Sequence, residues 1–193
     1  GKDSQYTNTT GQYNISIGYD SLQQSNANNC VAVGHDALKL NTVSNNTAVG
    51  YNALANNSTG SQNTALGSYA GEDVTTGQFN TLIGYTAGRN ITTGSNNTVI
   101  GHNNLVALTS ASANVAIGIN VMYQATGANN TCVGNGSGSS LTTGENNTYI
   151  GLNAGLSAST GSNNSCLGKN SSNSSATASN EVTLGDGLSL IHI

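Results

Sequence analysis

The stretch that decides the fold is Asn96-Asn97-Thr98-Val99-Ile100-Gly101, because nearly the same residues return along the whole chain. An earlier copy reads Asn45-Asn46-Thr47-Ala48-Val49-Gly50. In both copies an aliphatic residue precedes a glycine, and this pair recurs in eleven units spaced 16 or 17 residues apart. A period this regular indicates a repeat architecture. The repeat glycines are Gly18, Gly34, Gly50, Gly67, Gly84, Gly101, Gly118, Gly134, Gly151, Gly168 and Gly185.

Four columns of residue type precede these glycines. The asparagine column, four residues before, is Asn in nine of the eleven units, and the β-branched column, three before, is mostly Thr, Val or Ile. The small-residue column, two before, is mostly Ala, and the aliphatic column, directly before, is always Ile, Val or Leu. Such stretches are typical of short strands ended by a residue that permits positive φ. We predict an all-β parallel β-solenoid of about eleven coils over residues 1–185, about 50 Å long at ~4.8 Å per coil.

The composition excludes several classes of protein. Asn, Gly, Ser and Thr make up 103 of the 193 residues, so the chain cannot fill the large core of an ordinary globular enzyme. The scarcity of charge and the absence of Pro are unlike a disordered chain. A net charge of −4, with only four scattered Lys and Arg residues, predicts no nucleic-acid partner, and no apolar run approaches a membrane span. We expect no membrane insertion.

The two faces of the strand are both largely apolar. Alternation places the aliphatic and β-branched columns on one face and the small-residue column on the other. Because the aliphatic column is complete, we expect it to point into the coil. The small-residue column would then need cover from another copy of the chain. We therefore predict a homo-oligomer, most simply a parallel homotrimer, whose subunit interface comprises Ala32, Ala48, Ala65, Leu82, Val99, Ala116, Cys132, Tyr149 and Cys166. The alternative, that scattered small apolar surface residues need no cover, is disfavoured by the three large members of the column.

The quoted units resemble the head repeat of trimeric autotransporter adhesins (YadA-like) and, more closely, the related repeats of bacteriophage tail fibres. The resemblance covers roughly residues 12–185 and implies a left-handed parallel β-roll, assembled as a trimer on a virion tail fibre or a bacterial cell surface. The segment 178–186 is similar to segments that precede a self-cleaving chaperone in phage fibres. That similarity implies that the C-terminal tail, 186–193, lies near a fibre tip or a maturation cut.

A stripe of aromatic residues directly follows several repeat glycines. This aromatic column contains Tyr19, Tyr51 and Tyr85, with His35 and His102 between and after them. Exposed aromatic faces can stack on sugars, so the three tyrosines are candidate glycan contacts. The simpler interpretation is that the rings pack on one another as a ladder.

No constellation of catalytic groups is evident. The adjacent carboxylates Glu72 and Asp73 fit a solvated turn, and the two histidines of the aromatic column lie four coils apart, too far to share a metal within one chain. In a trimer, three copies of one histidine could still meet at the axis. Cys132 and Cys166 are two coils apart, beyond disulfide reach, so the cysteines are expected to replace Ala as small buried residues. We predict no enzyme activity, no metal and no cofactor.

The recurring Asn-x-Ser/Thr triplets are better explained by a ladder of asparagines bonded to backbone than by glycosylation. Taken together, the sequence predicts a structural fibre or adhesin segment that serves host-cell attachment. Its expected partners are other fibre segments and a host surface polysaccharide or protein receptor. The alternative is a monomeric ice-binding solenoid displaying Thr47, Thr64, Thr81 and Thr98. These threonines belong to the β-branched column, which shares a face with the aliphatic column. Because we expect that face to point into the coil, the threonines would lie inside, which favours the fibre.

Overall fold

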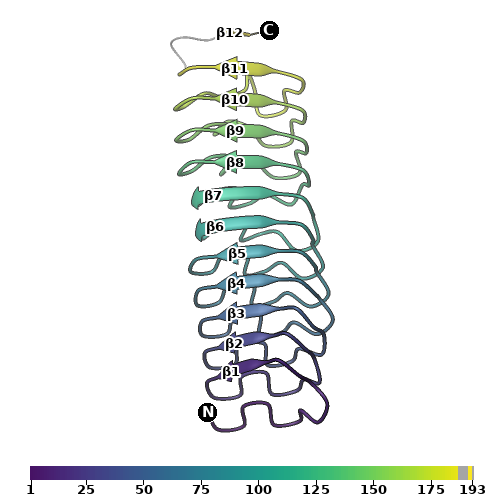
Figure 1. The fold of residues 1–193 in the computed structure, drawn as a ribbon. Helices are drawn as coiled ribbons and strands as arrows, with labels where there is room; N and C mark the ends of the chain where they lie inside the picture. The colour runs from purple at the N-terminus through teal and green to yellow at the C-terminus, as the bar shows by residue number, and fades with distance from the viewer. Residues whose placement is uncertain (187–190, 193) are drawn as a thin grey trace.

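The chain folds into one long parallel β-solenoid. In this computed structural model, residues 1–186 and 191–192 are described. Eleven strands stack in chain order as the rungs of a single parallel sheet, and a twelfth pairs with the last rung in the antiparallel direction (Figure 1). The strands are Ile15–Ile17 (β1), Val31–Val33 (β2), Thr47–Val49 (β3), Thr64–Leu66 (β4), Thr81–Ile83 (β5), Thr98–His102 (β6), Val115–Ile119 (β7), Thr131–Val133 (β8), Thr148–Ile150 (β9), Ser165–Leu167 (β10), Val182–Leu184 (β11) and Ile191–His192 (β12). The predicted all-β solenoid is confirmed.

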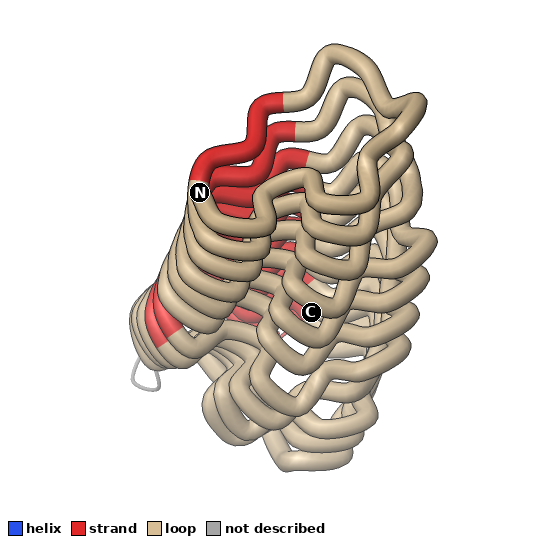
Figure 2. Tube along the Cα trace, turned by 90° about the horizontal axis from the view of Figure 1, so that it is seen from below, coloured by secondary structure: helices blue, strands red, loops and turns tan. Residues whose placement is uncertain are grey.

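Each coil contributes one strand and then returns through turns. Seen along the stack, the strands form one side of the coil, and loops and turns make up the other sides (Figure 2). The register keeps equivalent residues together: Ala48 pairs with Ala65, and Val49 with Leu66. The predicted columns are therefore true ladders. Of the expected tail at 186–193, residues 187–190 and 193 lie outside the described residues.

The repeat glycines are required by the backbone. At Gly151, φ is +136°, a conformation that side chains rarely adopt. A Cβ atom at this position would lie 2.5 Å from the carbonyl oxygen of Gly168 in the next coil. The glycine therefore permits both the sharp turn after the strand and the close stacking of coils.

The predicted asparagine ladder is also confirmed, and its members are buried. Asn63 donates its side-chain N–H to the carbonyl of Gly77 at 2.8 Å, and its Oδ1 accepts the backbone N–H of Asn80 at 2.9 Å. The same pair of bonds recurs in neighbouring coils. Both bonds of each amide thus reach the next coil, one to a turn carbonyl and one to the backbone N–H of the next asparagine, which satisfies buried backbone groups that no strand pairing reaches.

The prediction of which strand face points into the coil is wrong. The small-residue column points into the coil, where every proposed interface residue is 0% exposed: Ala32, Ala48, Ala65, Leu82, Val99, Ala116, Cys132, Tyr149 and Cys166. These residues form the core of a single chain and do not form a subunit interface. The physical reason is space, because a coil this thin admits mainly small side chains between its walls.

Size compensation confirms that this column fills the interior. The large ring of Tyr149 fits because residue 155, six positions later, is glycine; a Cβ there would lie 2.5 Å from Cγ of Tyr149 and would also strike Cδ2. Leu82 is likewise matched by Gly88, whose Cβ would lie 2.8 Å from Leu82. In the coils of Ala32 and Ala48, a fully buried Leu stands at this turn position instead, Leu38 and Leu54 respectively. The core is therefore continuous but only one or two side chains thick.

Candidate functional site

The outer face of the sheet is the most distinctive surface of the molecule. It carries the aliphatic and β-branched columns, which the sequence analysis had placed inside. Ile17 is 59% exposed, Leu66 48% and Ile150 43%. In β6 and β7 the strand extends past the repeat glycine, so His102 and Ile119 join the same face. The face is thus three columns wide and consists mainly of aliphatic, threonine and aromatic side chains.

The aromatic column forms an unbroken ladder over six coils. Ring centroids are 5.0 Å apart for Tyr19–His35, 5.3 Å for His35–Tyr51, 5.2 Å for Tyr51–Tyr69, 6.1 Å for Tyr69–Tyr85 and 5.4 Å for Tyr85–His102. Neighbouring rings are within the range of favourable aromatic pairing. The interpretation that the rings pack on one another is confirmed.

Tyr69 is the member of this ladder that sequence reasoning missed. Ser68 occupies the aromatic column in its coil, and Tyr69 follows one residue later with a left-handed φ of 59°. Its ring nevertheless bridges Tyr51 and Tyr85. A tyrosine adjacent to the one gap in the column was the signal available in the sequence.

The candidate glycan contacts remain accessible although each packs against neighbouring rings. Tyr19 is 41% exposed, Tyr51 45% and Tyr85 53%. Contacts with the neighbouring rings, stacked for Tyr19–His35 and tilted or edge-on for the other pairs, cover part of each ring, and a partner can reach the part that stays exposed. Whether a glycan uses them stays a prediction.

Charged residues gather at the turns beside the ladder and neutralise one another. The Nζ atom of Lys39 lies 3.1 Å from a carboxylate oxygen of Asp20 and 3.1 Å from one of Asp36. The hydrogen bond to Asp36, followed in size by that to Asp20, raises the pKa of the Lys39 ammonium group. Arg89 binds Glu72 at 2.6 Å and lies over the Tyr69 ring at 4.8 Å. The ladder is therefore flanked by closed ion pairs rather than by a field of one sign.

The four threonines considered for ice binding also point outward. Thr64 is exposed, and Thr47, Thr81 and Thr98 are half-buried by their neighbours on the face. They stack in register on adjacent strands of the sheet. The expectation that these threonines lie inside the coil is therefore wrong, and it gives no argument against an ice-binding face.

The cysteines are buried free thiols in the coil interior, as expected. Burial raises the pKa of Cys132 to about 12 and that of Cys166 to about 11, so both are protonated at neutral pH. Within residues 1–186 and 191–192, no group of three or more His, Cys, Asp or Glu side chains is placed to hold a metal ion. In the same residues, no helix is long and apolar enough to cross a membrane.

Comparison of this chain with protein-family models, with curated proteins and with solved structures gives no match. The functional proposals therefore rest on the geometry of the outer face and on the repeat motif.

Proposed function

We propose that this chain is a segment of a trimeric fibre or adhesin that serves host-cell attachment, with the outer face of the sheet as its subunit interface. The observation that carries the proposal is the complete aliphatic column on the outside of the coil. Eleven consecutive rungs present Ile, Val or Leu there, and several of these side chains are about half exposed. A continuous apolar stripe of this kind typically marks an interaction site.

The dimensions of the face suit association with a second copy. Ten intervals of ~4.8 Å give a length of ~48 Å, and the five residues from the β-branched column to the aromatic column, all of which are strand in β6 and β7, give a width of ~16 Å. The face therefore has a projected area of ~770 Å², close to the ~800 Å² that each partner buries in a standard interface.

A parallel arrangement lets every coil meet the same coil of its neighbours. Rods with identical rise stay in register along their whole length, so aliphatic side chains contact aliphatic side chains at each rung. The number three comes from the resemblance to the YadA-like head repeats and phage fibre repeats. The same resemblance motivates the proposed location on a virion or bacterial surface.

Light scattering of the purified chain tests the assembly. We expect three times the chain mass of 19.4 kDa. Ile100→Asp should reduce the mass to that of a monomer while leaving the far-ultraviolet spectrum unchanged, because the Ile100 side chain lies outside the coil. Thr93→Asp, on an exposed turn outside the sheet, is the matched control and should remain trimeric. A wild-type monomer would refute the proposal.

A second candidate is a monomeric ice-binding solenoid, favoured by the outward ladder of Thr47, Thr64, Thr81 and Thr98. The two functions need the same face in opposite states, covered in the fibre and open to water in the ice binder. A monomer whose thermal hysteresis disappears on Thr81→Tyr would support ice binding. A trimer without thermal hysteresis would exclude it. The fibre is preferred because the bulky rings of the aromatic column border the face, and an ice plane calls for a flat one.

A further inference from the structure

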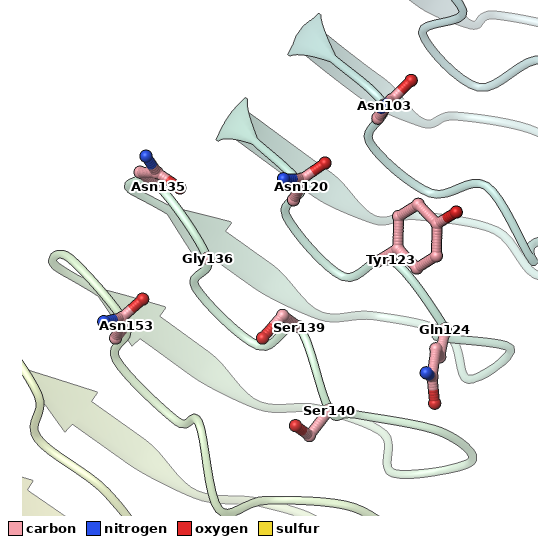
Figure 3. Close-up of a pocket in the computed structure, with 9 residues that line it drawn as sticks. All are labelled: Asn103, Asn120, Tyr123, Gln124, Asn135, Gly136, Ser139, Ser140 and Asn153. Atoms are coloured by element: carbon pink, nitrogen blue, oxygen red, sulfur yellow. The ribbon is translucent and has the colours of Figure 1, made fainter.

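We propose that a groove on the turns after β6 to β9 binds a neutral oligosaccharide. The groove has a volume of about 580 Å³, within the range of small-ligand sites. Figure 3 shows its lining residues on successive coils. The first of them, Asn103, directly follows His102, where the aromatic ladder ends. Its lining residues are Asn103, Asn120, Tyr123, Gln124, Asn135, Gly136, Ser139, Ser140 and Asn153.

The lining carries no charged side chain and is rich in amides and hydroxyls. Each amide offers both donors and acceptors, and each hydroxyl can serve as either. A ligand made of hydroxyl groups matches such a surface, whereas a phosphate, a carboxylate or an ammonium group finds no counter-charge there. The composition of the lining thus selects an uncharged, hydroxyl-rich molecule.

Several of these groups are free to bind. Within the described chain, the side chains of Asn120, Gln124 and Asn135 form no hydrogen bond with another protein group, and all three residues are exposed. By contrast, the asparagines of the interior ladder are buried and fully engaged. The chain therefore uses asparagine in two ways, and Asn120 and Asn135 in the groove keep their bonding capacity.

Tyr123 supplies the aromatic component. It is 43% exposed, and Figure 3 shows its ring on the turn beside Asn120, with Ser139 and Ser140 on the following coil. Among the residues that the structure describes, no aromatic ring contacts that of Tyr123, in contrast to the six rings of the ladder. Its exposed surface can pack against the C–H groups of a sugar ring while the amides bind the hydroxyls.

Gly136 opens the groove. The column two residues after the repeat glycine carries Asn at Asn103, Asn120 and Asn153, all with left-handed φ values of 53° to 54°. Gly136 occupies the same column with φ of 68°, and a Cβ atom there would lie 2.5 Å from Oδ1 of Asn153. The missing side chain leaves a gap in an otherwise continuous amide wall.

Gly136→Asn is therefore a blocking variant that restores the residue type of the neighbouring coils. Isothermal titration calorimetry of the full chain would use neutral hexasaccharides of glucose, N-acetylglucosamine, mannose and galactose, with hexagalacturonate as the acidic counterpart. We expect at least one neutral probe to bind with a Kd of about 1 mM or lower. Gly136→Asn should weaken that binding tenfold or more, and Tyr123→Ala by about two- to tenfold.

Phe79→Asn is the matched control. Phe79 is an exposed aromatic residue at φ of 58°, in a column where other coils carry Asn, so this variant removes an aromatic ring far from the groove at little cost to the fold. Its Kd should equal that of the wild type. Three outcomes would overturn the proposal: no binding of any neutral probe below 10 mM, preferential binding of hexagalacturonate, or equal affinities for the wild type and Gly136→Asn. Loss of binding on Tyr51→Ala alone would assign the site to the ladder instead.

This inference deepens the attachment role and is independent of the assembly. One chain forms the groove, so a monomer that binds sugar would refute only the trimer, and a trimer that binds none would refute only the groove.

Discussion

Replacing Asn97 by alanine is the sharpest test of how the solenoid is held together. Asn97 is fully buried, and its side-chain N–H groups bind Oδ1 of Asn80 at 3.1 Å and the carbonyl of Ala111 at 3.2 Å. Its Oδ1 accepts the backbone N–H of Asn114 at 3.0 Å and the side-chain N–H of Asn114 at 3.3 Å. One amide therefore joins three successive coils.

The cost of Asn97→Ala follows from the groups left behind. The N–H of Asn114 and the carbonyl of Ala111 lose the partners described above, and each buried unsatisfied group costs about 1–3 kcal/mol. The free energy of unfolding should fall by about 2–6 kcal/mol, a large part of the 5–15 kcal/mol that typically holds a domain together.

Urea denaturation followed by circular dichroism measures this loss. The matched control is Asn96→Gly, one residue earlier, where the side chain is exposed and φ of 59° suits glycine. The control should change the free energy of unfolding by less than about 0.5 kcal/mol. A difference between the two variants below about 1 kcal/mol would show that the asparagine ladder does not stabilise the fold.

Three further predictions concern a repeat glycine, the buried thiol and phenol groups, and which face of the strand points into the coil. Gly151→Ala should lower the free energy of unfolding by at least about 2 kcal/mol in urea titrations, because alanine meets the next coil at a positive φ. Burial raises the pKa of Cys132 from 9.0 and that of Tyr149 from 10.0, both to about 12. The unfolded chain therefore loses these protons at lower pH than the folded chain, and the free energy of unfolding should fall as the pH rises from about 9 to 12. Cys132→Ala should make this fall with pH less steep, as measured by urea denaturation at a series of pH values. Ala48→Asp should abolish folding by burying a charge, whereas Val49→Asp should leave a folded coil by circular dichroism; equal effects would contradict the observed phase.

The period and the in-register stacking could be predicted because each requirement is local and repeats in every coil. A glycine is needed wherever a Cβ would strike the next coil, as at Gly151, and an asparagine wherever a turn leaves a buried carbonyl and a buried N–H, as at Asn63. Each such requirement leaves the same residue type at a fixed interval. Eleven repetitions make the pattern legible without any structure.

The direction of the two faces could not be predicted from apolarity alone, because both faces of the strand are apolar. A completely aliphatic column was interpreted as the core, and the structure shows that the core is the column of small residues. Size compensation was the informative signal: the large Leu82 and Tyr149 are each followed six residues later by Gly88 and Gly155. Only residues that share one confined space need such pairing.

The reversed phase strengthens the case for a covered outer face. Eleven stacked Ile, Val and Leu side chains present more apolar surface to water than the column of mostly small residues would have done, and they lose stabilisation for as long as water contacts them. The interior is already filled by the small-residue column and by larger side chains from the turns, such as Leu54, so the exposed aliphatic column has no cover within its own chain. A chain built in this way gains most by association along its full length, and each added coil would lengthen the rod and its interface together.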